Sequence, residues 1–509
     1  MNLKISCLGG AGEIGMNMYL YETPTSAVVV DCGVIFSDPQ QYGVDSVLPD
    51  ISYLYGIKDK LKAVLFTHGH EDHVGGAIKL LSEFNLPIFT GKFTAALLEH
   101  KSSKLNINIV EPRLYTFGDI SVEFFPAQHS IPDTYGVVIV ADGFSCLHLS
   151  DFSHADPELL TRKIDCLLLD STNATTESRG YTEDDVKQEL YKIFSERSGG
   201  RIFLTTFSSN VARLGSAIDA AVRVGRKVVP EGASMERILG QAMRMGLISV
   251  NGKDIVSPKK AYKMEPSELV YLVSGCQGEP LSALATIASG ERKAIKMIEG
   301  DLLIFSSRLI PGSERNVNFL INSAMRRGVE VIQADDRLVH VSGHAGRGDL
   351  KAFIAAVAPK YFIPIHGEYR HLSAHRKLAI EAGVARESCL MLESGGQIQL
   401  WDEAVVYNEI PSGRVYIDGR GGYTLDESAV TMRKQIAKDG VVVVRLLPDG
   451  EIALETYGFT LTDKQERDVM LEIINRDIDF APLNEQLARV VKRYFKKQLS
   501  RRPYIAVSD

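Results

Sequence analysis

The sequence contains no apolar run that is long enough to cross a membrane, and it does not begin with a basic segment followed by an apolar one. A membrane span needs about 18 or more consecutive apolar residues, and a secretory signal needs that basic-to-apolar order. We therefore expect a soluble protein that has no membrane contact and resides in the cytoplasm.

Cysteine is scarce, and no two cysteines form a Cys-x-x-Cys pair. Paired spacing is what a disulfide framework or a cysteine-bound metal would show. The six cysteines are Cys7, Cys32, Cys146, Cys166, Cys276 and Cys389, and four of them lie in apolar, strand-like runs. We expect them to be reduced core residues of a cytosolic protein.

Positive charge is also not in excess, because the 57 Lys and Arg residues are outnumbered by 64 Asp and Glu residues, which gives a net charge of -7. This balance argues against a protein that coats nucleic acid by bulk electrostatics, although a local basic channel remains compatible with it. The length of 509 residues predicts two or three domains, and a hydrophobic content of 45% is ordinary for a globular protein.

Histidine, in contrast, is concentrated in one stretch, Thr67 to Gly76, which reads Thr-His-Gly-His-Glu-Asp-His-Val-Gly-Gly. The apolar run 61–66 predicts a strand, so His68 and His70 point the same way off its end. Asp72 and His73 follow near the start of a predicted helix, 74–84. Imidazole and carboxylate groups suit Zn²⁺ or Mn²⁺, and this stretch is interpreted as half of a two-metal site.

A glycine-rich turn, 9–15, follows the predicted strand 3–8 and contains Gly-x-Gly-x-x-Gly. A dinucleotide-binding fingerprint would need a helix next, but 16–21 is short and precedes Pro24, so a β-hairpin is favoured. Asp31 ends the next strand, where it is either a turn residue or a carboxylate that orients a ligand histidine.

Two further ligand candidates stand at strand ends. His129 follows the predicted strand 122–126, and Asp151 follows the strand 146–149. Asp31, the cluster from His68 to His73, His129 and Asp151 occur in the order of the four signature motifs of the metallo-β-lactamase superfamily, which the sequence resembles. That resemblance implies an αββα sandwich with a two-metal site at one edge of its sheets, in a superfamily of many hydrolases.

From about residue 179 to 332 strands alternate with helices, which predicts a small parallel α/β domain. Polar residues gather at two strand ends, 205–210 and 274–279. Such turns either bind anions at helix starts or serve as ordinary helix N-caps.

Histidines return after this segment. His366 follows the strand 361–364, and Asp170 closes another apolar strand before the segment begins. The loop His340, Val341, Ser342, Gly343 and His344 is flanked by glycine, so its backbone N–H groups could hold a phosphate while His344 donates a proton.

Asp170, His344 and His366 resemble the three additional motifs of the β-CASP nucleases, in which an inserted domain covers the metal site. In DNA-specific branches the last motif has Val, so His366 favours RNA. Whole segments resemble bacterial and archaeal ribonuclease J, namely 8–15, 67–76, 274–280, 340–345 and 363–370. This resemblance runs from Met1 to about Leu425.

The resemblance implies an α/β fold with four parts. Residues 1–178 and 346–425 would form the metallo-β-lactamase sandwich, 179–345 the inserted parallel β-CASP domain, and 426–509 a small C-terminal α+β domain. The helix 483–499 carries Lys492, Arg493, Lys496 and Lys497. This helix either binds RNA or a partner subunit, or presents a solvated face.

The resemblance also implies two divalent metal ions per chain, zinc in first place and manganese as an alternative. The implied ligands are His68, His70 and His129 for one ion and Asp72, His73 and His366 for the other, with Asp151 bridging. His344, Asp170 and Asp72 would be catalytic, residues 340–344 would seat the substrate phosphate, and Asp31 would orient a ligand.

The function implied is hydrolysis of phosphodiester bonds in single-stranded RNA, by 5′-to-3′ exonuclease and endonuclease action, in RNA maturation and decay. A homodimer or homotetramer is expected. Three alternatives remain open, namely a DNA-processing β-CASP nuclease, a small-molecule hydrolase of the metallo-β-lactamase fold, and a non-catalytic RNA-binding scaffold.

Overall fold

A computed structural model describes residues 3–36, 43–178, 180–292, 294–310, 312–401, 404–418, 423–447, 451–475 and 482–508. The chain forms two compact units, one of Met1–Val34 with Pro49–Gly413 and one of Ile35–Leu48 with Arg414–Asp509. Arg179, where the insert is expected to begin, lies outside the described residues. Within the described ranges, no helix has the length and apolar character that a membrane span requires.

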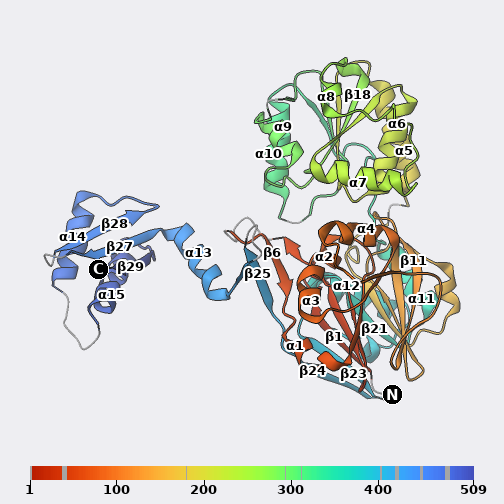
Figure 1. Ribbon diagram of the computed structural model, residues 1–509, viewed down its shortest axis with the longest axis horizontal. Coiled ribbons are helices and arrows are strands. Elements are labelled where there is room, and N and C mark those ends of the chain that lie inside the picture. Colours follow the sequence, from red (N-terminus) through yellow and green to blue (C-terminus); the bar gives the residue numbers. More distant parts are fainter. Residues whose placement is uncertain are drawn as a thin grey trace. The chain divides into compact units, whose positions relative to one another are not determined.

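The first unit contains two large sheets (Figure 1). One has the strand order β24 (Ala404–Glu409), β23 (Gly396–Trp401), β1 (Leu3–Gly9), β3 (Met18–Glu22), β4 (Ala27–Val30), β7 (Leu61–Leu65), β8 (Ile88–Thr90) and β9 (Ile107–Ile109). The other has the order β10 (Tyr115–Phe117), β11 (Ile120–Gln128), β12 (Thr134–Ala141), β13 (Phe144–Leu149), β15 (Cys166–Asp170) and β21 (Tyr361–Ile365), with β14 (His154–Ala155) paired to β11.

These sheets pack face to face as a sandwich, because alternate residues of each strand point into one shared core. Ile5 and Tyr21 of one sheet and Val122 and Ile363 of the other belong to that core. Helix α3 (Ala77–Phe84) covers the outer face of the eight-stranded sheet, whereas α11 (Arg347–Val357) and α12 (Tyr369–Glu381) cover that of the other. The resulting layers are the αββα arrangement that was predicted.

Local predictions around the first glycine turn and the histidine cluster had different outcomes. β1 pairs antiparallel with β3, and 10–22 contains no helix, so the hairpin interpretation is confirmed. The helix predicted over 74–84 is confirmed over Ala77–Phe84 and in its end at Phe84, but its predicted start is wrong. The chain forms α2 (Glu71–Val74) and then α3, because the amide of Gly76 bonds to the carbonyl of Cys32 instead of continuing the helix.

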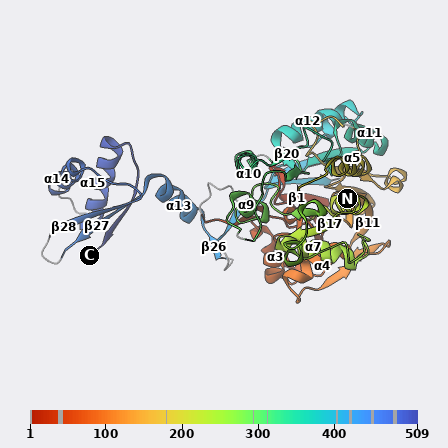
Figure 2. The same cartoon turned by 90° about the horizontal axis from the view of Figure 1, so that it is seen from above.

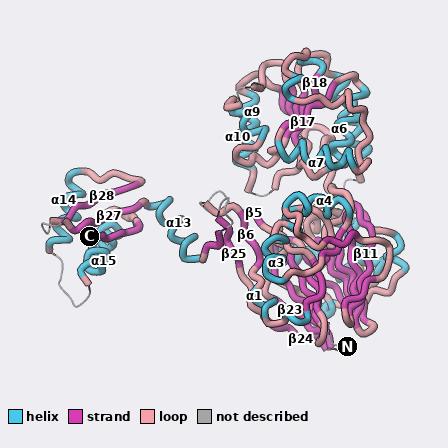
Figure 3. Tube along the Cα trace, in the orientation of Figure 1, coloured by secondary structure: helices cyan, strands magenta, loops and turns pink. Residues whose placement is uncertain are grey.

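The inserted segment forms a separate parallel sheet in the order β17 (Lys227–Glu231), β18 (Leu269–Val273), β16 (Ile202–Thr205), β19 (Leu302–Phe305) and β20 (Glu330–Ile332). One face carries α5 (Glu183–Glu196), α6 (Val211–Arg223) and α7 (Ala233–Arg244), and the other carries α9 (Ala283–Ser289) and α10 (Glu314–Met325). Figure 3 shows this central sheet with helices around it. The small parallel α/β domain is therefore as predicted.

Shorter elements complete the first unit. They are α1 (Ser52–Tyr55), α4 (Lys92–Lys101), α8 (Pro258–Ala261) and the paired short strands β2 (Ala11–Gly12) and β22 (Gly367–Glu368). Phe93 and Leu97 of α4 share an apolar cluster with the inserted domain. This cluster joins the insert to the sandwich close to the site described below.

The second unit is small and of the α+β type. Its elements are the sheet β28 (Ile452–Tyr457), β27 (Val441–Leu446) and β29 (Tyr504–Ser508), the sheet β26 (Tyr423–Leu425), β25 (Arg414–Asp418), β6 (Ser46–Pro49) and β5 (Ile35–Phe36), and helices α13 (Glu427–Asp439), α14 (Asp463–Ile474) and α15 (Leu483–Gln498). Helices α14 and α15 pack on the same face of the first of these sheets (Figure 2). The basic residues of α15 are exposed.

Candidate active site

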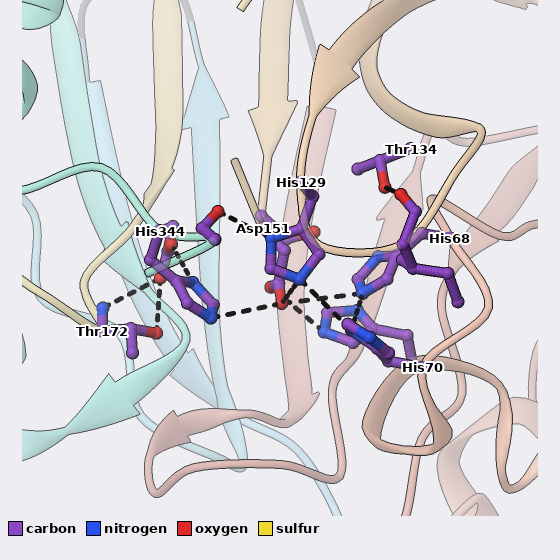
Figure 4. A network of polar contacts seen from close by, with 12 residues as sticks. His68, His70, His129, Thr134, Asp151, Thr172 and His344 are labelled. Atoms are coloured by element: carbon purple, nitrogen blue, oxygen red, sulfur yellow. Dashed lines mark hydrogen bonds and ion pairs between the residues drawn. The ribbon is translucent and has the colours of Figure 1, made fainter. Parts of the chain in front are cut away.

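The predicted metal ligands come together where strands of both sheets end (Figure 4). His68 follows β7, Asp151 follows β13 and His366 follows β21. β13, β15 and β21 are parallel neighbours, so their carboxyl ends meet at one edge. All seven predicted ligands fall into groups whose nitrogen and oxygen atoms lie within 4.8 Å of one another.

The first group consists of His68, His70, His129 and Asp151. Nδ1 of His70 lies 3.1 Å from Nε2 of His68 and 3.2 Å from Nε2 of His129. Oδ2 of Asp151 lies 3.6 Å from His68 Nε2 and 3.3 Å from His129 Nε2. Three imidazole nitrogens and one carboxylate oxygen thus face a common point.

The second group consists of Asp72, His73 and His366. Oδ2 of Asp72 lies 3.3 Å from Nε2 of His366 and 3.7 Å from Nε2 of His73. The other oxygen of Asp151, Oδ1, faces this group at 3.2 Å from His73 Nε2 and 3.5 Å from His366 Nε2. The two oxygens of Asp151 are therefore directed at different groups.

The donor set fits divalent cations. Oδ1 of Asp151 is buried and accepts no hydrogen bond from the described residues, and a buried carboxylate oxygen normally has a partner. Imidazole nitrogens and carboxylate oxygens are ligands of zinc and manganese. A cation in each group would supply the partner that the side chains themselves do not.

The outward-facing nitrogens of these histidines are held by other side chains, as is common for metal ligands. Oδ2 of Asp31 lies 2.7 Å from Nδ1 of His73. Asp31 also accepts a hydrogen bond from the backbone N–H of Thr67, at 2.9 Å. The backbone of Asp31 (φ 61°) is in the left-handed region, which costs free energy in a non-glycine residue. Asp31 thus contacts the ring of His73, one of the predicted ligands, and the backbone of the histidine cluster.

Three further residues that contact the ligand histidines were not predicted. Thr67 Oγ1 lies 3.0 Å from His68 Nδ1, and Thr172 Oγ1 lies 2.7 Å from His366 Nδ1. Asn17 Nδ2 lies 3.2 Å from His73 Nε2, which is the nitrogen that faces Asp72 and Asp151 and not the outward-facing one. Thr67 and Thr172 could have been suspected from their neighbours, whereas nothing in the sequence around Asn17 points to the site.

Burial and charge shift the pKa values of the histidines in opposite directions. Burial lowers the pKa of His129 to about 3, and the charge of Asp151 only partly offsets this. Burial acts on His73 as well, but Asp151, Asp72 and Asp31 outweigh it and raise the pKa of His73 to about 10. The carboxylates around the second group therefore create a negative potential that favours a cation.

His344 lies beside the two groups and is paired with Asp170. Nδ1 of His344 is 2.7 Å from Oδ2 of Asp170, and its Nε2 is 3.8 Å from Oδ2 of Asp151. Asn173 Nδ2 donates to the backbone oxygen of His344 at 3.0 Å and to Ser342 Oγ at 2.9 Å. The position of His344 is thereby fixed from both ring and backbone.

The loop 340–344 packs directly against the first group. Nδ1 of His129 lies 2.7 Å from the carbonyl oxygen of Gly343, and a Cβ at Gly343 would lie 2.8 Å from that nitrogen. Glycine is therefore required at 343 for the loop to lie this close to His129.

At the other end of the loop, Nη1 of the buried Arg213 donates to the carbonyl oxygen of Val339 at 3.0 Å and lies 3.4 Å from His340 Nδ1.

The polar stretch 205–210 has one of the two roles considered for it, that of a helix N-cap, and it also contacts the histidine cluster. Asn210 caps α6 by accepting a hydrogen bond from the backbone N–H of Arg213, which is the N-cap role. Ser209 Oγ lies 3.1 Å from Nε2 of His70. The inserted domain therefore reaches the ligand cluster through a side chain.

Comparison with known proteins identifies the family. Residues 44–225 match a β-lactamase superfamily domain, 199–324 the ribonuclease J β-CASP domain, and 331–388 a Zn-dependent metallo-hydrolase RNA specificity domain. Ribonuclease J 1 of Streptococcus pyogenes is 32% identical over 98% of this chain and 96% of its own length. The chain belongs to the ribonuclease J family.

Other members of the ribonuclease J family match over similar lengths. Ribonuclease J2 of Bacillus subtilis is 30% identical over 99% of this chain and 98% of its own, and ribonuclease J of Corynebacterium glutamicum is 33% identical over 99% and 75%. A solved structure of a protein of unknown function from Enterococcus faecalis has 17% identity and a TM-score of 0.56, over 79% of this chain and 100% of that one, which shows the fold alone. The predicted family and fold class are confirmed.

Proposed function

We propose that this member of the ribonuclease J family hydrolyses phosphodiester bonds of single-stranded RNA with two divalent metal ions. It acts as a 5′-to-3′ exonuclease and as an endonuclease, in RNA maturation and decay. The observation that carries the proposal is the carboxylate of Asp151, whose two oxygens face separate groups of ligand atoms beside His344. A shared carboxylate of this kind is typical of two-metal phosphodiester hydrolysis.

His68, His70 and His129 would hold one ion, Asp72, His73 and His366 the other, and Asp151 both. Zinc is the first choice and manganese the alternative, since both accept these ligands. Two such ions would lower the pKa of a water molecule towards neutrality and offset negative charge on the reacting phosphate. Asp31, Thr67 and Thr172 keep the ligand imidazoles in orientation.

His344 is the residue proposed to move a proton. Because the Nδ1–H of His344 donates to Asp170, Nε2 is the ring nitrogen that can contact the substrate. From there His344 can protonate the leaving 3′ oxygen or stabilise charge on the phosphorane. Asp72 contributes to catalysis through its position between His73 and His366.

The substrate phosphate would be seated on the loop of His340, Val341, Ser342, Gly343 and His344. Asn173 holds this loop by its hydrogen bonds to Ser342 and to the backbone of His344. In the proposed division of the chain, residues 1–178 and 346–425 supply the ligands, 179–345 cover the site, and 426–509 form the C-terminal domain.

RNA is favoured over the alternatives by two observations. The match of residues 331–388 to an RNA specificity domain supports RNA over DNA. The contact between Ser209 and His70 supports a polymeric substrate over a small one, because a small-molecule hydrolase needs no inserted domain at its ligands.

The six cysteines, all buried and unpaired, support a reducing cytoplasm. A homodimer or homotetramer is proposed from family membership.

The test is degradation of uniformly labelled RNA that carries either a 5′ monophosphate or a 5′ triphosphate, with zinc or manganese and with products sized over time. We expect mononucleotides from the monophosphate substrate and shorter internal fragments from both. A DNA strand of the same sequence should be cleaved far more slowly, and His344→Ala should lower turnover by about 100-fold or more. Absence of cleavage with either metal would overturn the proposal, and equal cleavage of DNA would favour the DNA-processing alternative.

A further inference from the structure

Arg308 lies in the inserted domain just after β19, and its side chain is exposed. Its guanidinium has five N–H donors. Among the residues that the structure describes, it makes one hydrogen bond, from Nη1 to Oδ1 of Asn173 at 3.2 Å. No carboxylate of the described chain pairs with it, so an exposed positive charge keeps most of its donors available.

Asn173 connects this charge to the proposed phosphate seat. Its Oδ1 accepts from Arg308, while its Nδ2 donates to Ser342 Oγ and to the backbone oxygen of His344. A single carboxamide thus separates the guanidinium from the loop that would hold the reacting phosphate. The charge of Arg308 also contributes, after burial and Arg213, to lowering the pKa of His340 at the start of that loop.

The backbone around Arg308 is held in place. Nε2 of Gln277, a nearly buried residue, donates to the carbonyl oxygen of Arg308 at 2.9 Å, and Oε1 of Gln277 accepts from the backbone N–H of Ile310 at 2.8 Å. Gln277 belongs to the segment 274–280, for which the proposed mechanism has no role. The backbone that carries this charge is therefore already ordered before a ligand binds, which reduces the entropy lost on binding.

We propose that Arg308 binds a phosphate of the RNA strand adjacent to the phosphate seated at Ser342–His344. Arginine is suited to this because its planar fork bonds two phosphate oxygens at once. Arg308 would therefore anchor the strand beside the reacting phosphate, while the sandwich supplies the proposed metal ligands. This inference rests on the proposed RNA hydrolysis and names one contact by which the insert recognises its substrate.

The salt dependence of RNA binding tests this directly. Each phosphate contact of a single strand contributes about 0.7 to the slope of log Kd against log salt. Binding of a labelled single-stranded RNA would be measured from low to high salt for His344→Ala protein, so that cleavage does not interfere, with and without Arg308→Met. We expect the second substitution to reduce the slope by about 0.7, and Arg308→Lys to restore it because the charge remains.

Turnover by the otherwise wild-type chain gives an independent readout. For Arg308→Met, KM for RNA should rise by about tenfold, with a much smaller effect on kcat. Arg326→Met is the matched control, since Arg326 is an exposed arginine of the same domain at the far end of α10, and it should change neither KM nor the slope. Equal melting temperatures would exclude loss of folding as the cause.

The outcomes separate the two proposals. If the wild type cleaves RNA and Arg308→Met has an unchanged slope, the Arg308 contact is wrong and the proposed function stands. If the wild type cleaves no RNA, the proposed function is wrong, whatever the slopes. A reduced slope in Arg308→Met that is regained in Arg308→Lys supports the contact.

Discussion

Oδ2 of Asp170 lies 2.7 Å from Nδ1 of His344, although 174 positions separate the two residues in sequence. Burial alone would raise the pKa of this carboxyl, but the charge of His344 and the hydrogen bond outweigh burial and hold the pKa of Asp170 below its ordinary value. Asp170 is therefore ionised at neutral pH and determines which nitrogen of His344 faces Asp151.

Asp170→Asn should lower kcat on RNA by about 100-fold or more with little change in KM, because His344 would lose its orientation but the phosphate seat would remain. Steady-state kinetics would measure this. Asp165→Asn, immediately before the same strand, is the control and should affect stability only. The double variant Asp170→Asn with His344→Ala should be no slower than His344→Ala alone, and additive losses would contradict a shared role.

Asp151→Asn should reduce the metal content of the purified protein from the proposed two ions per chain to one or none. Its two oxygens face different ligand groups, so that losing the charge weakens both. Elemental analysis after dialysis would measure this, and added zinc should not restore activity. Retention of two ions would show that Asp151 is not shared between them.

Gly343→Ala should reduce RNA cleavage by about tenfold or more. The added Cβ would lie 2.8 Å from Nδ1 of His129, so His129 or the loop must move, and small displacements of catalytic groups are costly. Gly348→Ala is the matched control, because nothing lies within 4 Å of a Cβ there. Comparison of kcat/KM for both variants gives the result, and equal activity would remove the steric argument.

Arg213→Met should destabilise the protein by about 3 kcal/mol or more, since a buried charge network would lose its central member. The fully buried Arg213 donates to Glu183 at 2.8 Å, to Ser306 Oγ at 2.7 Å and to the carbonyl oxygen of Val339 at 3.0 Å. Urea denaturation would measure the loss. Arg223→Met, at an exposed position of the same helix, should change stability by less than about 0.5 kcal/mol.

Stability should fall in acid partly because of His375. Burial lowers its pKa from 6.5 to about 3, and Asp170 offsets this only in part. The unfolded chain therefore takes up the proton first, and stability is lost as pH falls from about 6.5 towards about 3, by about 1.4 kcal/mol per pH unit. His375→Gln should lose stability less steeply over that range. Parallel pH profiles for variant and wild type would contradict this.

The sequence by itself determined which residues are the predicted ligands and which elements carry them. Buried strands such as β13 and β15 are recognisable as apolar runs, and a His or Asp just after such a run is placed at a sheet edge by local geometry alone. The order of the motifs was sufficient to predict the family and the αββα layers. Strands and short motifs can be predicted in this way because they depend on residues that are close in the chain, where covalent geometry fixes the spacing.

Only the tertiary structure decided how the site is held together. Ser209 meets His70 across 139 positions, Thr172 meets His366 across 194, and Asn173 meets Ser342 across 169. The break between α2 and α3 likewise depends on Cys32, a residue of a distant loop. Such contacts arise from the way separate elements pack, and the length of chain between two residues does not fix the distance between them in space. The sequence therefore contains Asp151 and Arg308 but does not show which residues each of them faces.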